Sequence, residues 1–342
     1  MHASGRRSLS PARLVLACFT CGLLAAIPPE EKKDAPGAVR VDPTIPKYKK
    51  VSGVAGTLKS VGSDSMNNLM ALWTAGFKKH YPGVSVEVEG KGSATAPPAL
   101  TEGTAHFGPM SREMKSDEID KLEKKFGYKP TGVKTSVDVL AVYVHKDNPL
   151  RSLSLQQIDA IFSKTRRGGA KGDIKTWGDL GLTGDWADKP ISLYGRNSAS
   201  GTYAYFKEHA LFKGDYKDEV KEQPGSGAVV QAIASDKYAI GYSGIGYKTA
   251  DVRAVAVAAK DSGKPFDANM ENAYAGTYPI ARFLLVYVNK DPQKPLDPLR
   301  LEFLRYALSF EGQEEVVKDG YIPLPAKTIT EELKKLGAGS LN

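Results

Sequence analysis

The sequence predicts an α/β protein of two lobes that are joined by two crossing strands. First, removing an N-terminal segment of 26 residues from the 342-residue chain leaves 342 − 26 = 316 residues. That length suits two lobes, at roughly 100–200 residues per domain. Second, from about Gly53 onward, patterns typical of strands alternate with patterns typical of helices. Third, two similar apolar runs, 139–144 and 283–288, begin 283 − 139 = 144 residues apart.

Local patterns predict the first elements. Val84, Val86 and Val88 alternate as in a strand. One face of a helix is predicted by residues spaced i, i+3, i+4, i+7 and i+11, namely Met66, Leu69, Met70, Trp73 and Phe77. Ser154 is a typical N-cap residue and precedes a helix with a second apolar face, Leu155, Ile158, Ile161 and Phe162.

Each of the two apolar runs is continuous and ends in a polar turn and a proline. Continuous apolar runs are expected of strands that are buried on both faces. We interpret them as two strands that link the lobes, with the C-terminus returning to the first lobe. This gives lobe 1 residues 51–140 and 283–342, and lobe 2 residues 141–282. The alternative is a chance similarity between two strands of one large sheet.

Residues 1–26 have the features of an export signal. Arg6, Arg7 and Arg13 precede a mainly apolar run over residues 14–27, and Ala25-Ala26 forms a small-residue cleavage site. The run is shorter than the ~20 residues that a membrane-spanning helix needs, so a secretory signal and not a membrane anchor is predicted. The alternative is lipoprotein processing at Cys18. Residues 27–50, rich in Pro, Lys, Glu and Asp, are expected to form a flexible leader.

Composition excludes several kinds of site. The only cysteines, Cys18 and Cys21, lie in the signal segment, which excludes disulfides, thiolate metal sites and cysteine nucleophiles from the processed chain. The five histidines are scattered without metal-ligand spacing, so neither a metal nor a cofactor is expected. The net charge falls from +8 to (47 − 3) − 39 = +5 on processing, with the basic residues dispersed. This argues against nucleic-acid binding and is compatible with a small anionic ligand.

Three glycine- and hydroxyl-rich turns each precede a predicted helix, at residues 62–65, 92–95 and 195–202. A helix N-terminus carries unpaired N–H groups and about half a positive charge, so it favours an anion. Ordinary N-capping is the alternative for any one turn. Because two turns belong to one predicted lobe and the third to the other, together they predict a cleft that closes on an oxyanion.

Arg196 stands in the third of these turns. A guanidinium can donate two parallel hydrogen bonds to a tetrahedral oxyanion. A salt bridge at the surface or between the lobes is the alternative, but the neighbouring Ser200, Gly201 and Thr202 favour the binding role. No G-x-S-x-G elbow or phosphate-binding loop motif is present, and no histidine is near Ser200 in the sequence, so no catalytic residue is predicted.

At these residues the chain resembles the periplasmic phosphate-binding proteins of the phosphate-specific ABC uptake system. The similarity covers residues 57–336, and its most specific part is Gly-Arg-Asn-Ser-Ala-Ser-Gly-Thr at 195–202, similar to the family's GRxxxSGT signature. Supporting segments are 92–95, 159–163, 177–180, 231–234, 239–242 and 320–324. The resemblance implies a type II periplasmic-binding fold, a monomer that closes over inorganic phosphate, and delivery to an inner-membrane ABC permease.

The resemblance also implies which residues hold phosphate. Those of the first lobe are Asp64, Ser65 and Ser93. Those of the second are Arg196, Ser200, the Gly201 amide and Thr202. Further candidates are Ser63, Ser111 and Arg112.

The chain departs from the best-known members of that family at two positions. Many have an aspartate after the serine that corresponds to Ser111, where it accepts the proton of hydrogen phosphate; here Arg112 follows. An aspartate can also stand in place of Ser198. Because arginine accepts no proton, we expect Asp64 to take that role. The alternative is an N-cap aspartate that faces solvent. For Arg112 itself two roles stay open, a second ligand clamp or the ion-pair partner of Asp64.

The sequence therefore predicts a non-catalytic binding protein that captures phosphate by closing two lobes. One alternative is a receptor of the same fold for sulfate, molybdate or another oxyanion. The other is a secreted phosphatase that uses Ser200 or Asp64.

Overall fold

The computed structural model describes residues 39–339 and residue 341, and Val39–Asn342 form one compact unit. The expected signal peptide, the Cys18 processing site and leader residues 27–38 lie outside the described residues. No helix in the described part of the chain is long and apolar enough to cross a membrane.

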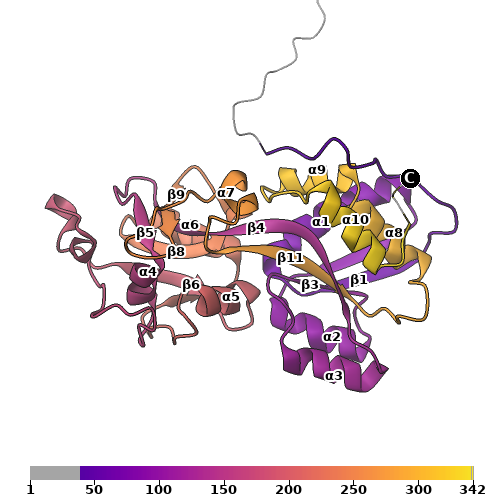
Figure 1. Cartoon of the computed structure of the whole chain (residues 1–342), viewed down its shortest axis with the longest axis horizontal. Coiled ribbons are helices and arrows are strands. Elements are labelled where there is room, and N and C mark those ends of the chain that lie inside the picture. The colour runs from indigo at the N-terminus through magenta and orange to yellow at the C-terminus, as the bar shows by residue number, and fades with distance from the viewer. Residues whose placement is uncertain (1–38, 340, 342) are drawn as a thin grey trace, which may run out of the picture. The chain divides into compact units, whose positions relative to one another are not determined.

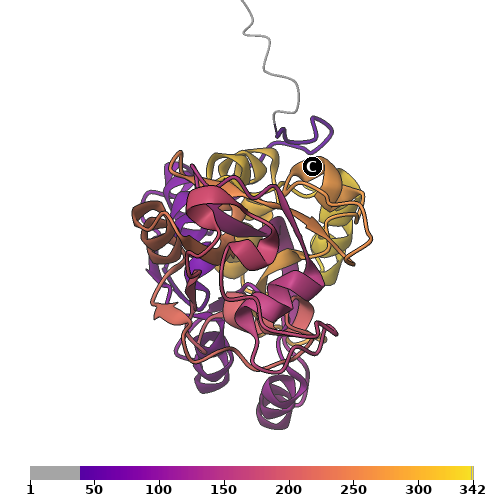
Figure 2. The same cartoon turned by 90° about the vertical axis from the view of Figure 1, so that its left-hand side faces the viewer.

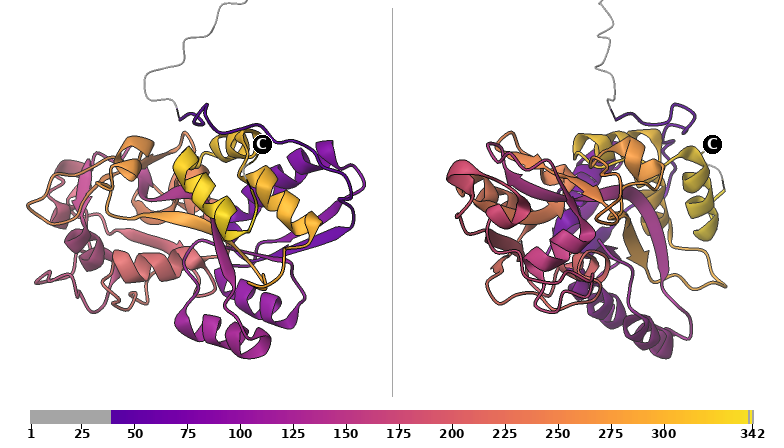
Figure 3. Two further views of the ribbon diagram at one scale, coloured as in Figure 1. Left: turned by 45° about the vertical axis from the view of Figure 1, so that its right-hand side comes forward. Right: turned by 60° about the vertical axis from the view of Figure 1, so that its left-hand side comes forward.

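The first half of the unit contains the N-terminal elements and the C-terminal helices. Its elements are β1 (Thr57–Val61), η1 (Asp64–Met66), α1 (Asn67–His80), β2 (Ser85–Glu89), η2 (Ser93–Thr95), α2 (Ala96–Glu102), β3 (Phe107–Met110), α3 (Ser116–Phe126), α8 (Pro298–Ala307), α9 (Phe310–Lys318) and α10 (Ala326–Lys335). Figures 2 and 3 show α8–α10 on one side of the sheet and α2 and α3 on the other.

The second half contains the middle of the chain. Its elements are β5 (Ser152–Ser154), α4 (Leu155–Phe162), η3 (Gly178–Leu180), η4 (Gly184–Trp186), β6 (Ser192–Arg196), α5 (Gly201–His209), β7 (Lys221–Gln223), α6 (Ser226–Ser235), β8 (Ala239–Gly244), η5 (Ile245–Tyr247), β9 (Val252–Ala254), β10 (Ala256–Ala258) and α7 (Met270–Tyr274).

Two long strands, β4 (Thr131–His145) and β11 (Ala281–Val288), connect the halves (Figure 1). The sheet order is β2-β1-β3-β11-β4-β8-β6-β7, with β9 also paired to β4 and β10 paired to β5. Strand β4 pairs antiparallel with β11 over residues 131–139 and then with β8 over residues 140–144. The predicted pair of linking strands is therefore present, although the strands also form one continuous hydrogen-bonded path. The residue limits of the two lobes stay a prediction.

The predicted local elements are confirmed, with shifted ends. All five residues of the predicted helical face are completely buried, although Met66 lies in η1 just before α1. The predicted strand is β2, which begins one residue after Val84. Ser154 caps α4, because its Oγ accepts a hydrogen bond from Gln157 N at 3.0 Å while the Gln157 side chain accepts from Ser154 N.

The end of the predicted flexible leader differs from expectation. Ile45 and Tyr48 are buried, 3% and 7% exposed, against the first half. Tyr48 Oη donates to Glu302 Oε2 at 2.8 Å, and Phe310 N donates to Pro46 O at 3.0 Å. Composition favoured flexibility, but two apolar anchors three residues apart are enough to hold residues 45–48 against α8 and α9.

The halves also touch away from the three turns, where η5 meets the end of α9. A Cβ on Gly246 would lie 2.5 Å from the carbonyl oxygen of Asp319, and Gly320 has a φ of +80°. Only glycine allows so close an approach at Gly246. One carboxylate oxygen of Asp319 is buried without a hydrogen-bond partner among the described residues, and burial raises the pKa of this carboxyl to about 7.

Replacing Asp319 by asparagine should stabilise the protein in neutral and alkaline solution. The pKa of Asp319 is higher in the folded chain than in the unfolded chain, so the folded state binds the extra proton between about pH 4 and pH 7 and loses stability as pH rises through that range. At pH 8 we expect Asp319→Asn to raise the free energy of unfolding by about 1–2 kcal/mol, since the side chain is only partly buried. At pH 4 we expect little change.

The measurement is urea unfolding of the wild-type and variant proteins at both pH values. Asp188→Asn, at an exposed aspartate, is the matched control and should change stability little at either pH. An equal effect of Asp319→Asn at pH 4 and pH 8 would contradict the interpretation.

Candidate functional site

The three glycine-rich turns meet between the two halves. Ala94 N, in the second turn, donates to Ala199 O of the third at 3.1 Å. Ser65 Oγ, in the first turn, lies 2.9 Å from Thr202 Oγ1. A Cβ on Gly201 would lie 2.3 Å from Ser93 Oγ, so the start of α5 can press against η2 only because that residue is glycine. The closed arrangement of turns that the sequence predicted is therefore present.

One cluster of hydroxyls comes wholly from the first half. Ser63 Oγ donates to Ser111 Oγ at 3.0 Å, and Ser93 Oγ lies 3.3 Å from Ser111 Oγ. Ser93 Oγ also accepts from Ser111 N at 3.0 Å. All three serines are at most 2% exposed, and the Cα of Gly201 faces Ser93 and Ser111. Ser63 and Ser111 thus lie together with the predicted residue Ser93.

A second set of hydroxyls crosses between the halves and includes a residue that the sequence analysis missed. Ser65 Oγ lies between Thr202 Oγ1, at 2.9 Å, and Ser226 Oγ, at 3.3 Å. Ser226 begins α6, and its Oγ accepts from Arg196 Nη1 at 2.7 Å. Ser226 could have been found from the sequence, because Gly225-Ser226-Gly227 is a fourth glycine- and serine-rich turn before a helix. Unlike residues 195–202, this turn does not resemble the family signature.

Arg196 is buried at the end of β6, with 2% of its surface exposed. Its Nη2 donates to Pro224 O at 3.2 Å, and its Nε has no hydrogen-bond partner among the described residues. Burial, the larger effect, lowers the pKa of Arg196, while the nearby Asp64 carboxylate opposes that change. A buried guanidinium with an unused donor is suited to receive an anion.

Asp64 bridges the two halves. Its Oδ2 lies 3.2 Å from Arg196 Nη1 and accepts from Ser226 N, the first amide of α6, at 2.8 Å. The alternative of a solvent-facing cap is therefore wrong: the carboxylate is directed at the positive end of α6 and at Arg196. Among the described residues, no hydrogen-bond donor contacts its other oxygen, Oδ1.

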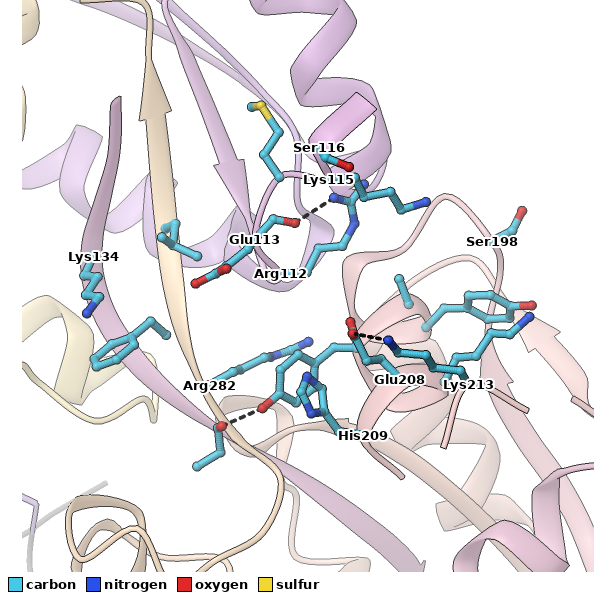
Figure 4. A pocket seen from close by; sticks show the side chains of 18 residues that line it. Arg112, Glu113, Lys115, Ser116, Lys134, Ser198, Glu208, His209, Lys213 and Arg282 are labelled. Carbon is cyan, nitrogen blue, oxygen red and sulfur yellow. Dashed lines mark hydrogen bonds and ion pairs between the residues drawn. The ribbon is translucent and has the colours of Figure 1, made fainter. Parts of the chain in front are cut away.

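Arg112 does not pair with Asp64. Its guanidinium makes two hydrogen bonds to Glu118, both of 2.7 Å, and a third to the carbonyl oxygen of Glu113 at 2.8 Å. Figure 4 shows Arg112 across a cavity of about 990 Å³ from Ser198, Glu208 and Lys213. An ion pair with Asp64, one of the two roles left open for Arg112, is therefore wrong, because Glu118 in the first turn of α3 is a local acidic partner, six residues along the chain.

Ser200 is the N-cap of α5. Its Oγ accepts from Thr202 N at 3.1 Å and from Tyr203 N at 3.3 Å. Capping uses the oxygen lone pairs and leaves the hydroxyl hydrogen available to another acceptor.

A buried ion pair on the two linking strands was not predicted from the sequence. Arg282 Nε and Nη2 donate to Asp138 Oδ2 at 3.0 and 2.7 Å, and the two residues are 5% and 0% exposed. Arg282 also donates to Ser111 O at 2.7 Å and to Thr202 Oγ1 at 2.9 Å. The available signal was a charged residue immediately before each apolar run, at positions 138 and 282. A charge at the edge of a buried strand must find a partner there.

The site therefore combines the Arg196 guanidinium, hydroxyl hydrogens and helix N-termini among buried side chains. Such a set of donors suits an oxyanion. Residues 39–339 and 341 contain no group of three or more His, Cys, Asp or Glu side chains that could hold a metal ion.

Comparisons with known proteins agree on one family. Residues 49–311 match the family described as PBP superfamily domain. The phosphate-binding protein PstS of Pseudomonas aeruginosa is 58% identical over 303 residues, covering 89% of this chain and 94% of that protein.

Two solved structures are similar to this chain. One, from Clostridium perfringens, contains bound phosphate and is assigned as a phosphate ABC transporter substrate-binding protein. It is 28% identical, with a TM-score of 0.67 over 79% of this chain and 100% of that chain. The ABC-type phosphate transport receptor from Vibrio cholerae is 22% identical, with a TM-score of 0.60 over 78% of this chain and 100% of its own. At that identity the likeness concerns the fold.

Breaking the Asp138–Arg282 pair should cost far more stability than replacing both partners. Arg282→Met leaves a buried carboxylate without its cation, so we expect a loss of about 3–5 kcal/mol in the free energy of unfolding. Asp138→Asn combined with Arg282→Met removes both charges, and we expect most of that loss to be recovered.

Urea unfolding without added ligand measures both effects. Arg253→Met is the matched control, because Arg253 donates to the carbonyl oxygens of Asn148 and Leu150 and not to a carboxylate. If the double variant were as unstable as Arg282→Met alone, an uncompensated charge would not be the cause.

Proposed function

The chain belongs to the PBP superfamily and, within it, to the family of PstS phosphate-binding proteins, and we propose that it binds inorganic phosphate between its two halves. The type II periplasmic-binding fold predicted from the resemblance is confirmed by the family match and the similar structures. The observation that carries the proposal for this chain is Arg196: buried, positively charged, and with Nε unpaired among the described residues at the point where the three turns meet.

The proposed ligand set follows from the contacts around Arg196. Arg196 supplies charge-assisted hydrogen bonds, which are shorter and stronger than neutral ones. Ser226 Oγ accepts directly from Arg196, and Ser65 and Thr202 continue from Ser226 as a row of hydroxyl contacts that includes both halves. The N-terminus of α5 adds the Gly201 amide and the favourable end of a helix dipole. We propose as ligands Ser65, Ser93, Arg196, Ser200, Gly201 and Thr202, together with Asp64, and we add Ser63, Ser111 and Ser226. Arg112, engaged with Glu118, is left out.

Asp64 is our proposed acceptor for the proton of hydrogen phosphate. Its Oδ2 is already occupied by Arg196 and Ser226 N, which orients the carboxylate and leaves Oδ1 to accept a proton. Phosphate near neutral pH carries at least one O–H, whereas sulfate carries none. A carboxylate in the site therefore favours phosphate and repels the fully ionised anion. Without this acceptor, a receptor for sulfate or molybdate would be the better proposal.

A phosphatase is less well supported. Ser200 Oγ caps α5, and within residues 39–339 no histidine makes a hydrogen bond or ion pair with Ser200 or Asp64 that would provide a general base. The similar proteins are named as binding proteins or transport receptors and not as hydrolases.

We further infer that the protein acts outside the inner membrane and delivers phosphate to an ABC permease. The support is the N-terminal export signal predicted from the sequence, together with the transporter role in the name of the similar Clostridium perfringens structure. A single compact unit with one closing site is consistent with a monomer.

Calorimetric titration should show tight phosphate binding and no sulfate binding. The experiment uses residues 27–342, unfolded and refolded to remove bound ligand, at neutral pH. In Asp64→Asn we expect phosphate to bind at least about tenfold more weakly, because an acceptor that also orients Arg196 is lost, and sulfate binding to appear.

Asp261→Asn, which changes an aspartate that accepts from Ser154 in the second half, is the matched control and should leave both titrations unchanged. Equal binding of phosphate and sulfate by the wild-type protein would indicate a general oxyanion receptor. Binding of neither by a demonstrably folded protein would refute the proposed function.

A further inference from the structure

An arginine stands at each end of the hydroxyl chain that crosses the site. The chain runs from Thr202 Oγ1 through Ser65 Oγ to Ser226 Oγ, with O···O distances of 2.9 and 3.3 Å. Arg282 Nη2 donates to Thr202 Oγ1 at 2.9 Å, and Arg196 Nη1 donates to Ser226 Oγ at 2.7 Å. All five side chains are at most 5% exposed.

The three linked hydroxyls have more hydrogens than they can share among themselves, and the two arginines cannot accept the excess. A guanidinium only donates, whereas a hydroxyl has one hydrogen to donate and two lone pairs to accept. The three hydroxyls therefore carry three hydrogens but share only two O···O contacts. At least one hydrogen must point out of the chain, and neither arginine can accept it. The site is thus arranged to offer hydroxyl hydrogens to an acceptor such as an oxyanion.

The two arginines do not have the same role. Arg196 keeps an unpaired Nε among the described residues, whereas Arg282 uses four of its five N–H groups, two to Asp138 Oδ2, one to Ser111 O and one to Thr202 Oγ1. The charge of Arg282 is also balanced at short range by Asp138. Arg196 is therefore suited to contact a ligand, and Arg282 is suited to act through its neighbours.

We propose that Arg282 is a positioning residue for anion recognition, which it achieves by keeping the Thr202 hydroxyl oriented as a hydrogen-bond donor. While Thr202 Oγ1 accepts from Arg282, its hydrogen is directed away from the guanidinium, toward Ser65 or the bound anion. Without Arg282, the hydroxyl is free to rotate and loses this preference. The inference rests on the proposed function, because the acceptor it concerns is phosphate.

The contacts of Arg282 and its partner Asp138 reach both halves. Arg282 lies on β11, and its partner Asp138 lies on β4 just before β4 changes its pairing from β11 to β8. Asp138 Oδ1 accepts from Ile245 N of the second half at 3.1 Å, while Arg282 holds Ser111 O of the first. The contact to Thr202 extends this linkage to the start of α5.

A double-mutant cycle for phosphate affinity tests the proposal. Its four proteins are the wild type, Thr202→Val, the pair replacement Asp138→Asn/Arg282→Met, and the combination of all three substitutions. Calorimetric titration with inorganic phosphate gives each dissociation constant. We expect Thr202→Val to weaken binding about tenfold or more in the wild-type background, since it removes an oriented donor to a charged ligand. In the pair-replaced background the same change should cost less than about threefold.

Thr135→Val provides a matched control. Thr135 is also completely buried, and its hydroxyl donates to Leu284 O at 3.1 Å on the linking strands and not to the site. Its effect on phosphate affinity should be small and equal in both backgrounds. A purely structural role of the pair would change ligand-free stability and would leave the Thr202→Val effect equal in the two backgrounds.

The outcomes separate this inference from the proposed function. Additive effects in a wild-type protein that binds phosphate would overturn the role of Arg282 and leave the proposed function standing. No phosphate binding by the folded wild-type protein would overturn both. If the pair replacement does not fold, the cycle is repeated with Arg282→Lys, which keeps the positive charge but not the forked geometry. If Thr202→Val weakens phosphate binding less in the Arg282→Lys background than in the wild type, the inference is supported. If it weakens binding equally in both, the inference is overturned.

Discussion

The buried ion pair of Asp138 and Arg282 is the interaction on which the rest of the arrangement depends. Removing two charges from water costs several kcal/mol each, and their mutual attraction offsets that only if the remaining hydrogen-bonding groups are also satisfied. Here the compensating contacts come from Ser111, Thr202 and Ile245, which belong to different halves. Satisfying one ion pair thus brings together a serine cluster, the start of α5, and the point where β4 changes partners.

The site beside this pair combines charged side chains that are held by partners with hydroxyl groups whose hydrogens can rotate. Arg196 and Asp64 form a less deeply buried pair, since Asp64 is 24% exposed, and each keeps an atom available to a ligand. Neutral hydroxyls provide most of the remaining hydrogen-bond donors. Binding an anion therefore requires no unpaired cation to be held in the empty site, because both arginines already have a carboxylate beside them.

Local sequence patterns anticipated the elements well because their causes are local. The buried face of α1 follows from the spacing of five apolar residues, and the cap of α4 follows from Ser154 and Gln157. The three glycine- and hydroxyl-rich turns could be found in the same way, since a helix N-terminus and its Ser, Thr and Gly residues are neighbours along the chain. The burial of Ile45 and Tyr48 was not predicted, because the average composition of residues 27–50 does not show which single apolar side chains pack against the fold.

By itself, the sequence determined the α/β class, the linking strands, the three turns and Arg196 as a candidate ligand, because each depends on residues close together along the chain. Only the tertiary structure decided which charges meet. Arg112 pairs with Glu118, Asp64 with Arg196 and Asp138 with Arg282, although the last two pairs are 132 and 144 positions apart (196 − 64 and 282 − 138). Whether two charged residues form an ion pair depends on their distance in space and on their burial, and the spacing of residues along the sequence gives neither.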